Sequence, residues 1–183
     1  RQRAHQAANG VAQWFRDPAR GRNGAPDLVA ITDETGRVIA RNQDPNRMYG
    51  TQLGQELPAV RKVLRDGEGR HDVWLKSDED KLLQIGVAPV RSAQGAVIGT
   101  LVVGYDLSNG LASREAEILG RDVAFVVEGG VYSSSLQEAG PVAALKSQLF
   151  GALQQDTRAA LAGTGSRPWH ARIGGDEWVG VTA

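Results

Sequence analysis

Alternating apolar and polar positions predict two similar hairpins, one in each half of the chain. The first hairpin runs from an apolar stretch at 28–32, through a polar turn, to a return strand at 38–41. The second runs from 123–127, through a turn with two glycines, to 131–134. Each hairpin is followed by a helical stretch and further strands, and the second half ends one strand short. This repetition predicts two related α+β modules rather than a single catalytic core.

The period of the apolar residues predicts the remaining elements. Apolar residues at 52–66 recur three or four positions apart, which predicts an amphipathic helix that ends at Gly67. Ser108 or Asn109 is expected to cap a further helix that Gly120 closes. This helix covers 109–118. The other expected helices are 1–16 and 141–161, and the other expected strands are 72–76, 82–90, 96–107, 169–173 and 178–182.

These elements divide the chain into four expected parts. The first, 1–26, is an N-terminal helix with a linker, and the second, 27–108, is the module expected to bind a ligand. A connecting helix at 109–121 leads to a second, incomplete module at 122–183. A length of 183 residues is sufficient for two small domains of this kind.

Composition excludes several classes of function. Acidic and basic residues balance at 21 each, so the chain lacks the positive field that nucleic-acid binding requires. The absence of cysteine excludes thiol catalysis, disulfides and thiolate metal sites. No stretch of about 20 apolar residues occurs, so no transmembrane segment is expected within these residues. Because the chain starts at Arg1 inside a helical pattern, we expect it to be a piece of a longer protein.

The expected strands 82–90 and 96–107 each have one bulky face and one face of smaller, partly polar residues. The smaller faces are Gln84, Gly86 and Ala88 on the first strand, and Thr100, Val102, Gly104 and Asp106 on the second. We interpret these two faces as one shared surface that lines a ligand cavity, with the bulky side packed on the N-terminal helix. The alternative is that the small residues simply receive a closely packed helix.

Nine residues are candidates for this cavity: Thr32, Arg41, Tyr49, Trp74, Lys76, Gln84, Ala88, Thr100 and Asp106. Arg41 or Lys76 could pair with a ligand carboxylate, and arginine could do so through two parallel hydrogen bonds. Asp106 could accept a hydrogen bond from a ligand ammonium or hydroxyl group. Other roles stay open, because Asp106 could start the following helix, Trp74 could belong to the core, and both cations could be solvated.

No catalytic or metal-binding constellation is evident. The three histidines, His5, His71 and His170, lie in different elements without the spacing of metal ligands. The acidic cluster 78–80 is interpreted as a solvated hairpin turn, since it lacks the glycine and spacing of a calcium loop. We therefore expect neither an enzyme nor a resident metal or cofactor.

Three sequence segments show a family resemblance: PDLVAITDETGRVIARN, LLQIGVAPVRSAQGAVIGTLVVGYDLS and VAFVVEGGVYSSSL. In this order they resemble the double Cache domains of bacterial transmembrane receptors. The resemblance implies a PAS-like antiparallel sheet with a long N-terminal helix, followed by a smaller α+β module. It also implies a membrane-distal ligand site in 27–108, a periplasmic or extracellular location, a membrane anchor in the full-length protein, and a homodimer through the N-terminal helix. The arginine and aromatic cluster of the family's amino-acid-binding members is not found here.

The leading hypothesis is an extracytoplasmic sensor domain of a histidine kinase, chemoreceptor or similar receptor. It would bind a small organic molecule, with a carboxylate as the expected class, and signal by a population shift that alters how the sheet holds the N-terminal helix. The alternative is an intracellular PAS-like domain that binds a haem, a flavin or a protein partner. His71 is the only histidine near a strand where a haem could be ligated, and an absorption spectrum would separate the two hypotheses.

Overall fold

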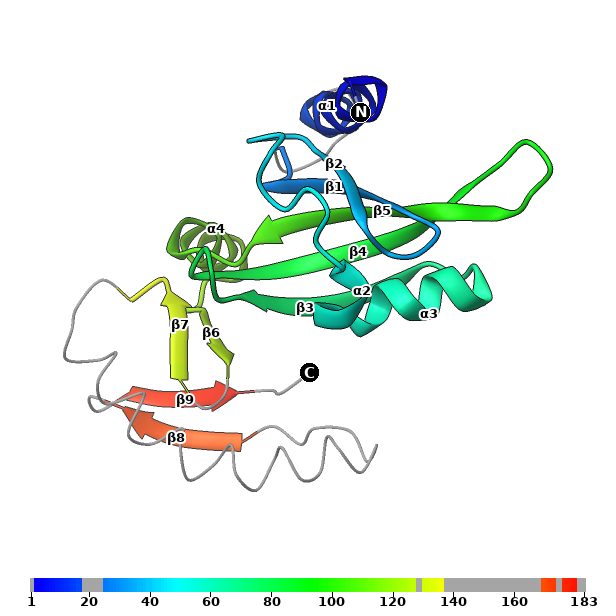
Figure 1. Ribbon diagram of the computed structural model, residues 1–183. Coiled ribbons are helices and arrows are strands. Elements are labelled where there is room, and N and C mark those ends of the chain that lie inside the picture. The colour runs from blue at the N-terminus through cyan, green and yellow to red at the C-terminus, as the bar shows by residue number, and fades with distance from the viewer. Residues whose placement is uncertain (1, 18–24, 128–129, 137–168, 174–175, 181–183) are drawn as a thin grey trace. The chain divides into compact units, whose positions relative to one another are not determined.

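The computed structural model describes residues 2–17, 25–127, 130–136, 169–173 and 176–180 (Figure 1). The chain forms two compact units, Arg1–Asp106 and Leu107–Ala183, which are described here one at a time. The expected helix at 141–161 lies outside the described residues.

The first unit is built on a five-stranded antiparallel sheet. Its strands are β1 (Leu28–Asp33), β2 (Val38–Arg41), β3 (Arg70–Lys76), β4 (Lys81–Arg91) and β5 (Val97–Asp106). They lie in the order β2-β1-β5-β4-β3, so β2 and β3 form the two edges and β1 pairs with the last strand, β5. All five strands were expected from the apolar alternation, with bounds that differ by at most two residues.

Three helices accompany this sheet: α1 (Gln2–Arg16), α2 (Leu53–Glu56) and α3 (Pro58–Asp66). The single helix expected at 52–66 is interrupted at Leu57, which has an extended backbone with φ −124° and ψ 94°. A residue that precedes proline is sterically disfavoured in the helical region, which explains the break before Pro58. Gly67 ends α3 in the left-handed conformation, as the sequence predicts.

The two faces of the sheet pack against different helices (Figure 1). We call them the α3 face and the α1 face. Buried residues on the α3 face and on α2 and α3 form the larger core: Leu28, Ala30, Val38, Leu53, Leu57, Ala59, Val60, Val63, Trp74, Leu83, Ile85, Val87 and Val102. The α1 face has a smaller core, in which Ala8 and Ala12 of α1 pack against Val29 and Ala40.

The bulky side of β4, with Leu83, Ile85 and Val87, belongs to the α3 face. The expectation that it packs on the N-terminal helix is therefore wrong. Since β2 and β3 are opposite edges of the sheet, the chain that joins them must cross the sheet, and α2 and α3 cover the bulky side as it does so. The helix α1 packs instead on β1 and β2.

The register of β4 and β5 also differs from expectation. Gln84 lies opposite Tyr105, Ala88 opposite Leu101, and Leu83 opposite Asp106. Directly opposite residues in an antiparallel pair share a face, so the small side of β4 shares its face with the bulky side of β5. The small faces of β4 and β5 therefore lie on opposite sides of the sheet and do not form one surface. A register that differs by one residue is enough to bring a different pair of faces together.

The second unit begins with α4 (Asn109–Leu119). Ser108 caps this helix, its hydroxyl oxygen accepting a hydrogen bond from the Leu111 amide at 3.4 Å, and Gly120 ends it with φ +61°. Both ends agree with the sequence-based prediction.

Two separate two-stranded sheets follow in this unit, and all four strands are antiparallel to their partners. They are β6 (Ala124–Val127) with β7 (Gly130–Ser134), and β8 (Trp169–Ile173) with β9 (Asp176–Gly180). Across the residues that the structure describes, no helix combines the length and apolar character needed to cross a bilayer.

Candidate functional site

The nine candidate residues separate onto the two faces of the first sheet. Those on the α3 face are Thr32, Arg41, Trp74, Lys76, Thr100 and Asp106. Gln84 and Ala88 lie on the α1 face. Tyr49 lies in the connection after β2 and is 49% exposed. The sequence therefore identified residues from two different surfaces.

Arg41 and Lys76 lie in a buried ionic cluster around Glu79. The Arg41 guanidinium donates two hydrogen bonds to the Glu79 carboxylate, Nη1 to Oε1 at 2.8 Å and Nη2 to Oε2 at 3.3 Å. Lys76 Nζ lies 3.4 Å from the same Oε1, and Arg47 Nε lies 3.3 Å from it. Lys76 also donates to Asp78 at 2.5 Å. These five residues are called the Glu79 cluster below.

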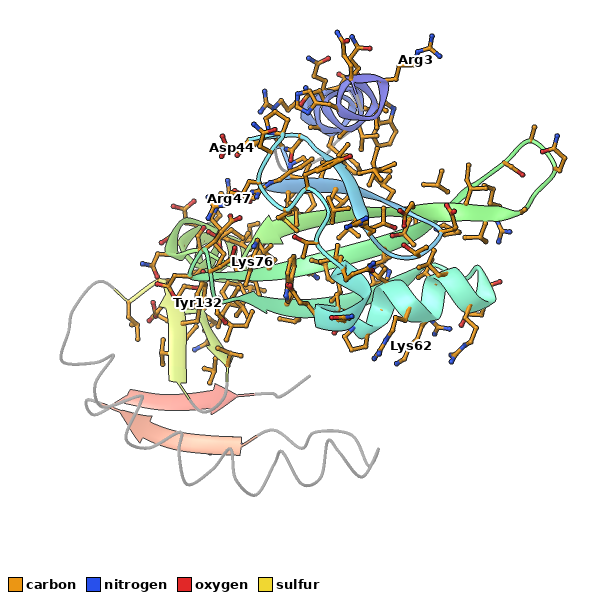
Figure 2. All side chains as sticks on the ribbon, in the orientation of Figure 1. Arg3, Asp44, Arg47, Lys62, Lys76 and Tyr132 are labelled. Atoms are coloured by element: carbon orange, nitrogen blue, oxygen red, sulfur yellow. The ribbon has the colours of Figure 1, made fainter. Side chains whose placement is uncertain are left out.

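The cluster is positioned by both edges of the sheet. Arg41 is the last residue of β2 and Lys76 the last of β3, while Glu79 belongs to the turn that joins β3 to β4. Arg47 comes from the connection after β2, and Figure 2 shows Arg47 and Lys76 at the same end of the unit. A link between positions 41 and 79 therefore ties the two edge strands together.

The cluster is almost fully removed from solvent at its centre. The exposed fractions of the side chains are 5% for Arg41, 4% for Lys76 and 8% for Glu79. The alternative in which both cations are solvated is therefore wrong. The turn 77–80 is present as expected, but the Glu79 side chain is buried and compensates the charges of the buried Arg41 and Lys76.

Electrostatics keep Glu79 ionised at neutral pH. Burial alone would raise its pKa, but the hydrogen bond and charge of Arg41, followed by the charges of Lys76 and Arg47, lower the pKa of Glu79 from 4.5 to about 2. The cluster thus holds three cations and two carboxylates. Arg41 Nε is buried and makes no hydrogen bond, so the guanidinium retains one donor that is not used.

Trp74 supplies an apolar wall beside the cluster. It is buried in the larger core, in agreement with the core alternative considered for it. The Lys76 ammonium lies 5.3 Å from the centroid of the Trp74 ring, within the range of a cation–π interaction. Charged and apolar surfaces therefore meet at this end of the α3 face.

Thr32 and Thr100 are bonded to each other and so have a structural role between β1 and β5. Their hydroxyl oxygens are 2.8 Å apart, and the Thr100 amide donates to the Thr32 hydroxyl oxygen at 3.1 Å. The Asp106 amide donates to an Asp27 carboxylate oxygen at 2.9 Å. Because Ser108 caps α4, Asp106 is not the residue that starts that helix.

A groove lies on the α1 face of the sheet. It has a volume of about 540 Å³ and is lined by Phe15, Gly69, Arg70, His71, Gln84, Ile85, Gly86, Val87, Ala88, Leu101, Val103 and Tyr105. The small side of β4 therefore does border a hollow, but one next to α1 and away from Arg41 and Lys76. We refer to it as the α1-side groove.

Helix α1 contacts the backbone of a cluster residue. The Nδ1–H of His5 donates to the carbonyl oxygen of Arg41 at 2.6 Å, and Asn9 donates to the other ring nitrogen at 3.1 Å. Arg41 thus contacts Glu79 through its side chain and α1 through its backbone carbonyl. In the described part of the chain, no group of three His, Asp or Glu side chains is arranged to hold a metal ion.

Sequence reasoning missed Glu79, Arg47 and Asp78 as site residues. Glu79 stands in a run of three acidic residues, which is typical of an exposed turn. Its partner Arg41 lies 38 positions earlier, and no local pattern connects the two. The only signal was Lys76 close to the acidic run, which predicts a nearby ion pair but not its burial.

A five-stranded antiparallel sheet between an N-terminal helix and a crossing helical segment defines a PAS-like α+β sensor fold. The chain matches, over residues 25–182, the family described as the double sensory domain of two-component sensor kinase (dCache_3). It belongs to this family, which confirms the resemblance to double Cache domains and a ligand-sensing role in signal transduction. The family's description names a sensory function.

Solved structures with similar folds include two sensor domains. The sensor domain of the histidine kinase DctB from Vibrio cholerae is 20% identical, with 72% of this chain and 50% of that chain covered and a TM-score of 0.46. The DcuS sensor domain from Escherichia coli is 17% identical, with 65% and 81% covered and a TM-score of 0.40. No curated protein matches the chain. The family assignment therefore rests on the match over 25–182.

Proposed function

We propose that the first unit senses a small organic carboxylate through Arg41 and Lys76. The observation that carries the proposal is the burial of two cations, each about 95% removed from solvent, at one end of the α3 face. Burial of a cation is costly and needs compensation by an anion. Two such cations at one point suit a site for an anionic group.

The chemistry of the cluster favours a carboxylate over other ligands. A guanidinium matches the two oxygens of a carboxylate through parallel hydrogen bonds. Arg41 has one unused donor, Nε, for a further acceptor. The Trp74 ring beside Lys76 offers an apolar surface for the body of the ligand. A small carboxylate with a short hydrocarbon or aromatic part satisfies these groups.

The signal would leave the site through α1. A ligand that moves Arg41 would also move the carbonyl oxygen that His5 holds at 2.6 Å. A ligand shifts the equilibrium between two conformations when it binds one of them more tightly than the other. Here the two conformations would differ in the position of β2, and the ligand would favour one of them. Contacts of α1 with β1 and β2 would then transmit the preference.

We place this domain on the periplasmic or extracellular side of the inner membrane, in a membrane-anchored receptor that forms a homodimer through α1. The family's link to two-component sensor kinases supports a receptor. The inner side of α1 is occupied by the sheet, whereas Trp14 is 43% exposed. Light scattering of the protein with and without Trp14→Ala tests the dimer, and an unchanged mass would contradict it.

The ligand site is tested by thermal shift and calorimetry with acetate, malonate and benzoate, each paired with its amide. Binding that stabilises only the folded state adds about 2.7 kcal/mol at 100 times the dissociation constant. We expect carboxylates to bind, Arg41→Gln to abolish binding, and Arg70→Gln to leave it unchanged. Arg70 is a matched control because it also makes an ion pair and has an unused Nε. Equal binding by Arg41→Gln would refute the site.

A further inference from the structure

Glu79 occupies the place that a ligand carboxylate would take. Its two oxygens lie 2.8 and 3.3 Å from the two terminal nitrogens of Arg41, the geometry of a bidentate carboxylate. The same carboxylate reaches Lys76 and Arg47. The proposed anion site is thus already filled, by a residue of the chain itself.

A ligand could share the cations with Glu79 or replace it. Sharing would bring two carboxylates to one guanidinium, and like charges at close range repel each other. Replacement exchanges one carboxylate for another, so the three cations of the cluster keep the same total negative charge around them. Both terminal nitrogens of Arg41 are already bonded to Glu79, so a ligand carboxylate can take this bidentate geometry only by replacing Glu79.

The turn that carries Glu79 is suited to moving. The Glu79 amide donates to the Lys76 carbonyl at an ordinary 3.1 Å, but the bond from the Asp80 amide to the Ser77 carbonyl is long at 3.4 Å. Asp80 has φ +49°, a conformation that non-glycine residues seldom adopt. In the turn, Ser77, Asp78 and Asp80 are exposed and the Glu79 side chain is buried. Within the turn 77–80, Glu79 is therefore the residue whose side chain reaches the interior.

We infer that Glu79 is a built-in competitor, displaced from Arg41 and Lys76 by a ligand carboxylate, and that its release moves the turn 77–80. This inference rests on the proposed function and adds the regulation of the same site. Apparent affinity is lowered by the fraction of molecules in which Glu79 holds the site. Binding of the ligand carboxylate and movement of the turn 77–80 are then coupled.

The test removes the Glu79 carboxylate by mutation and offers a free carboxylate, acetate, in its place. Glu79→Ala leaves a space for one small carboxylate, and acetate is matched by acetamide as the neutral control. Glu68→Ala is the control variant, because it removes an exposed carboxylate outside the Glu79 cluster. We expect acetate to bind Glu79→Ala at least about tenfold more tightly than wild type. Acetamide should bind to neither protein.

Movement of the turn is followed separately. The chain has no cysteine, so Ser77→Cys can carry a single environment-sensitive fluorophore in otherwise unchanged protein. We expect acetate and malonate, but not their amides, to change its emission. This readout decides the inference even if Glu79→Ala does not fold.

The outcomes separate this inference from the proposed function. Carboxylate binding by wild type with no gain in Glu79→Ala and no response of the label overturns the displacement, while the ligand site stands. Binding by Glu79→Ala alone shows that Glu79 is not displaced in wild type, and it overturns both the displacement and carboxylate sensing by the wild-type protein. No carboxylate binding by either protein overturns the proposed function as well.

Discussion

Replacing Glu79 by glutamine is expected to destabilise the first unit at neutral pH and to lose this effect in acid. The folded-state pKa of Glu79 is about 2, below the ordinary value of 4.5. A carboxyl group with a depressed pKa contributes stability that is fully present above its unfolded pKa. That contribution is lost as the pH falls from about 4.5 through about 2.

The magnitude follows from the same shift. A pKa difference of roughly 2.5 corresponds to about 3 kcal/mol if nothing screens the group. Arg47 is 46% exposed, so solvent reaches one side of the cluster, and we expect about 1 to 2 kcal/mol. Glutamine resembles the protonated glutamic acid in shape and charge. The variant should therefore match the wild-type protein once the wild-type carboxyl group is itself protonated.

The assay is urea unfolding followed by far-UV circular dichroism at pH 7, 5.5, 4 and 3 for both proteins. The difference in the free energy of unfolding should be largest at pH 7 and 5.5 and smaller at pH 3. Glu68→Gln removes an exposed carboxylate outside the cluster and is the control. A difference between wild type and Glu79→Gln that stays the same from pH 7 to pH 3 would refute the role of the Glu79 charge.

Three further changes test the packing of the first unit by chemical or thermal unfolding. Gly99→Ala should destabilise by about 1 to 3 kcal/mol, because its Cβ would lie 2.1 Å from the Thr32 carbonyl oxygen; an unchanged melting temperature would contradict the register of β1 and β5. Thr100→Val should cost about 0.5 to 1.5 kcal/mol, since it removes the buried hydrogen bond between the two hydroxyl groups while Thr32 keeps its bonds to the Asp33 carbonyl and the Thr100 amide, and Thr100→Ser should cost less. Leu83→Ala should cost about 2 to 5 kcal/mol in the buried core, whereas equal loss in Ile98→Ala, on the exposed part of β5, would argue against this core.

Local signals predicted most of the elements that the structure describes. Strand alternation, the turn before Val97, and the helix ends at Gly67 and Gly120 all depend on neighbours a few residues apart. The break at Leu57 was also present in the sequence as a residue before proline, and apolar periodicity alone concealed it. These features are decided by backbone sterics within a short segment.

The partition of the site residues between two faces could not be predicted in the same way. Alternation along β4 and β5 identifies two faces for each strand, but not which face of one adjoins which face of the other. The pairing of Gln84 with Tyr105 decides this, and register depends on the pairing of whole strands and their turns.

The sequence by itself determined the α+β class, the order of the elements and the residue types available for a sensor site. Only the tertiary structure decided that Glu79 is buried against Arg41, because Arg41 ends one edge strand, β2, and Glu79 lies in the turn after the other edge strand, β3. Contacts between residues far apart in the chain follow from the packing of the complete sheet. An isolated run of acidic residues contains no information about which distant cation it will neutralise.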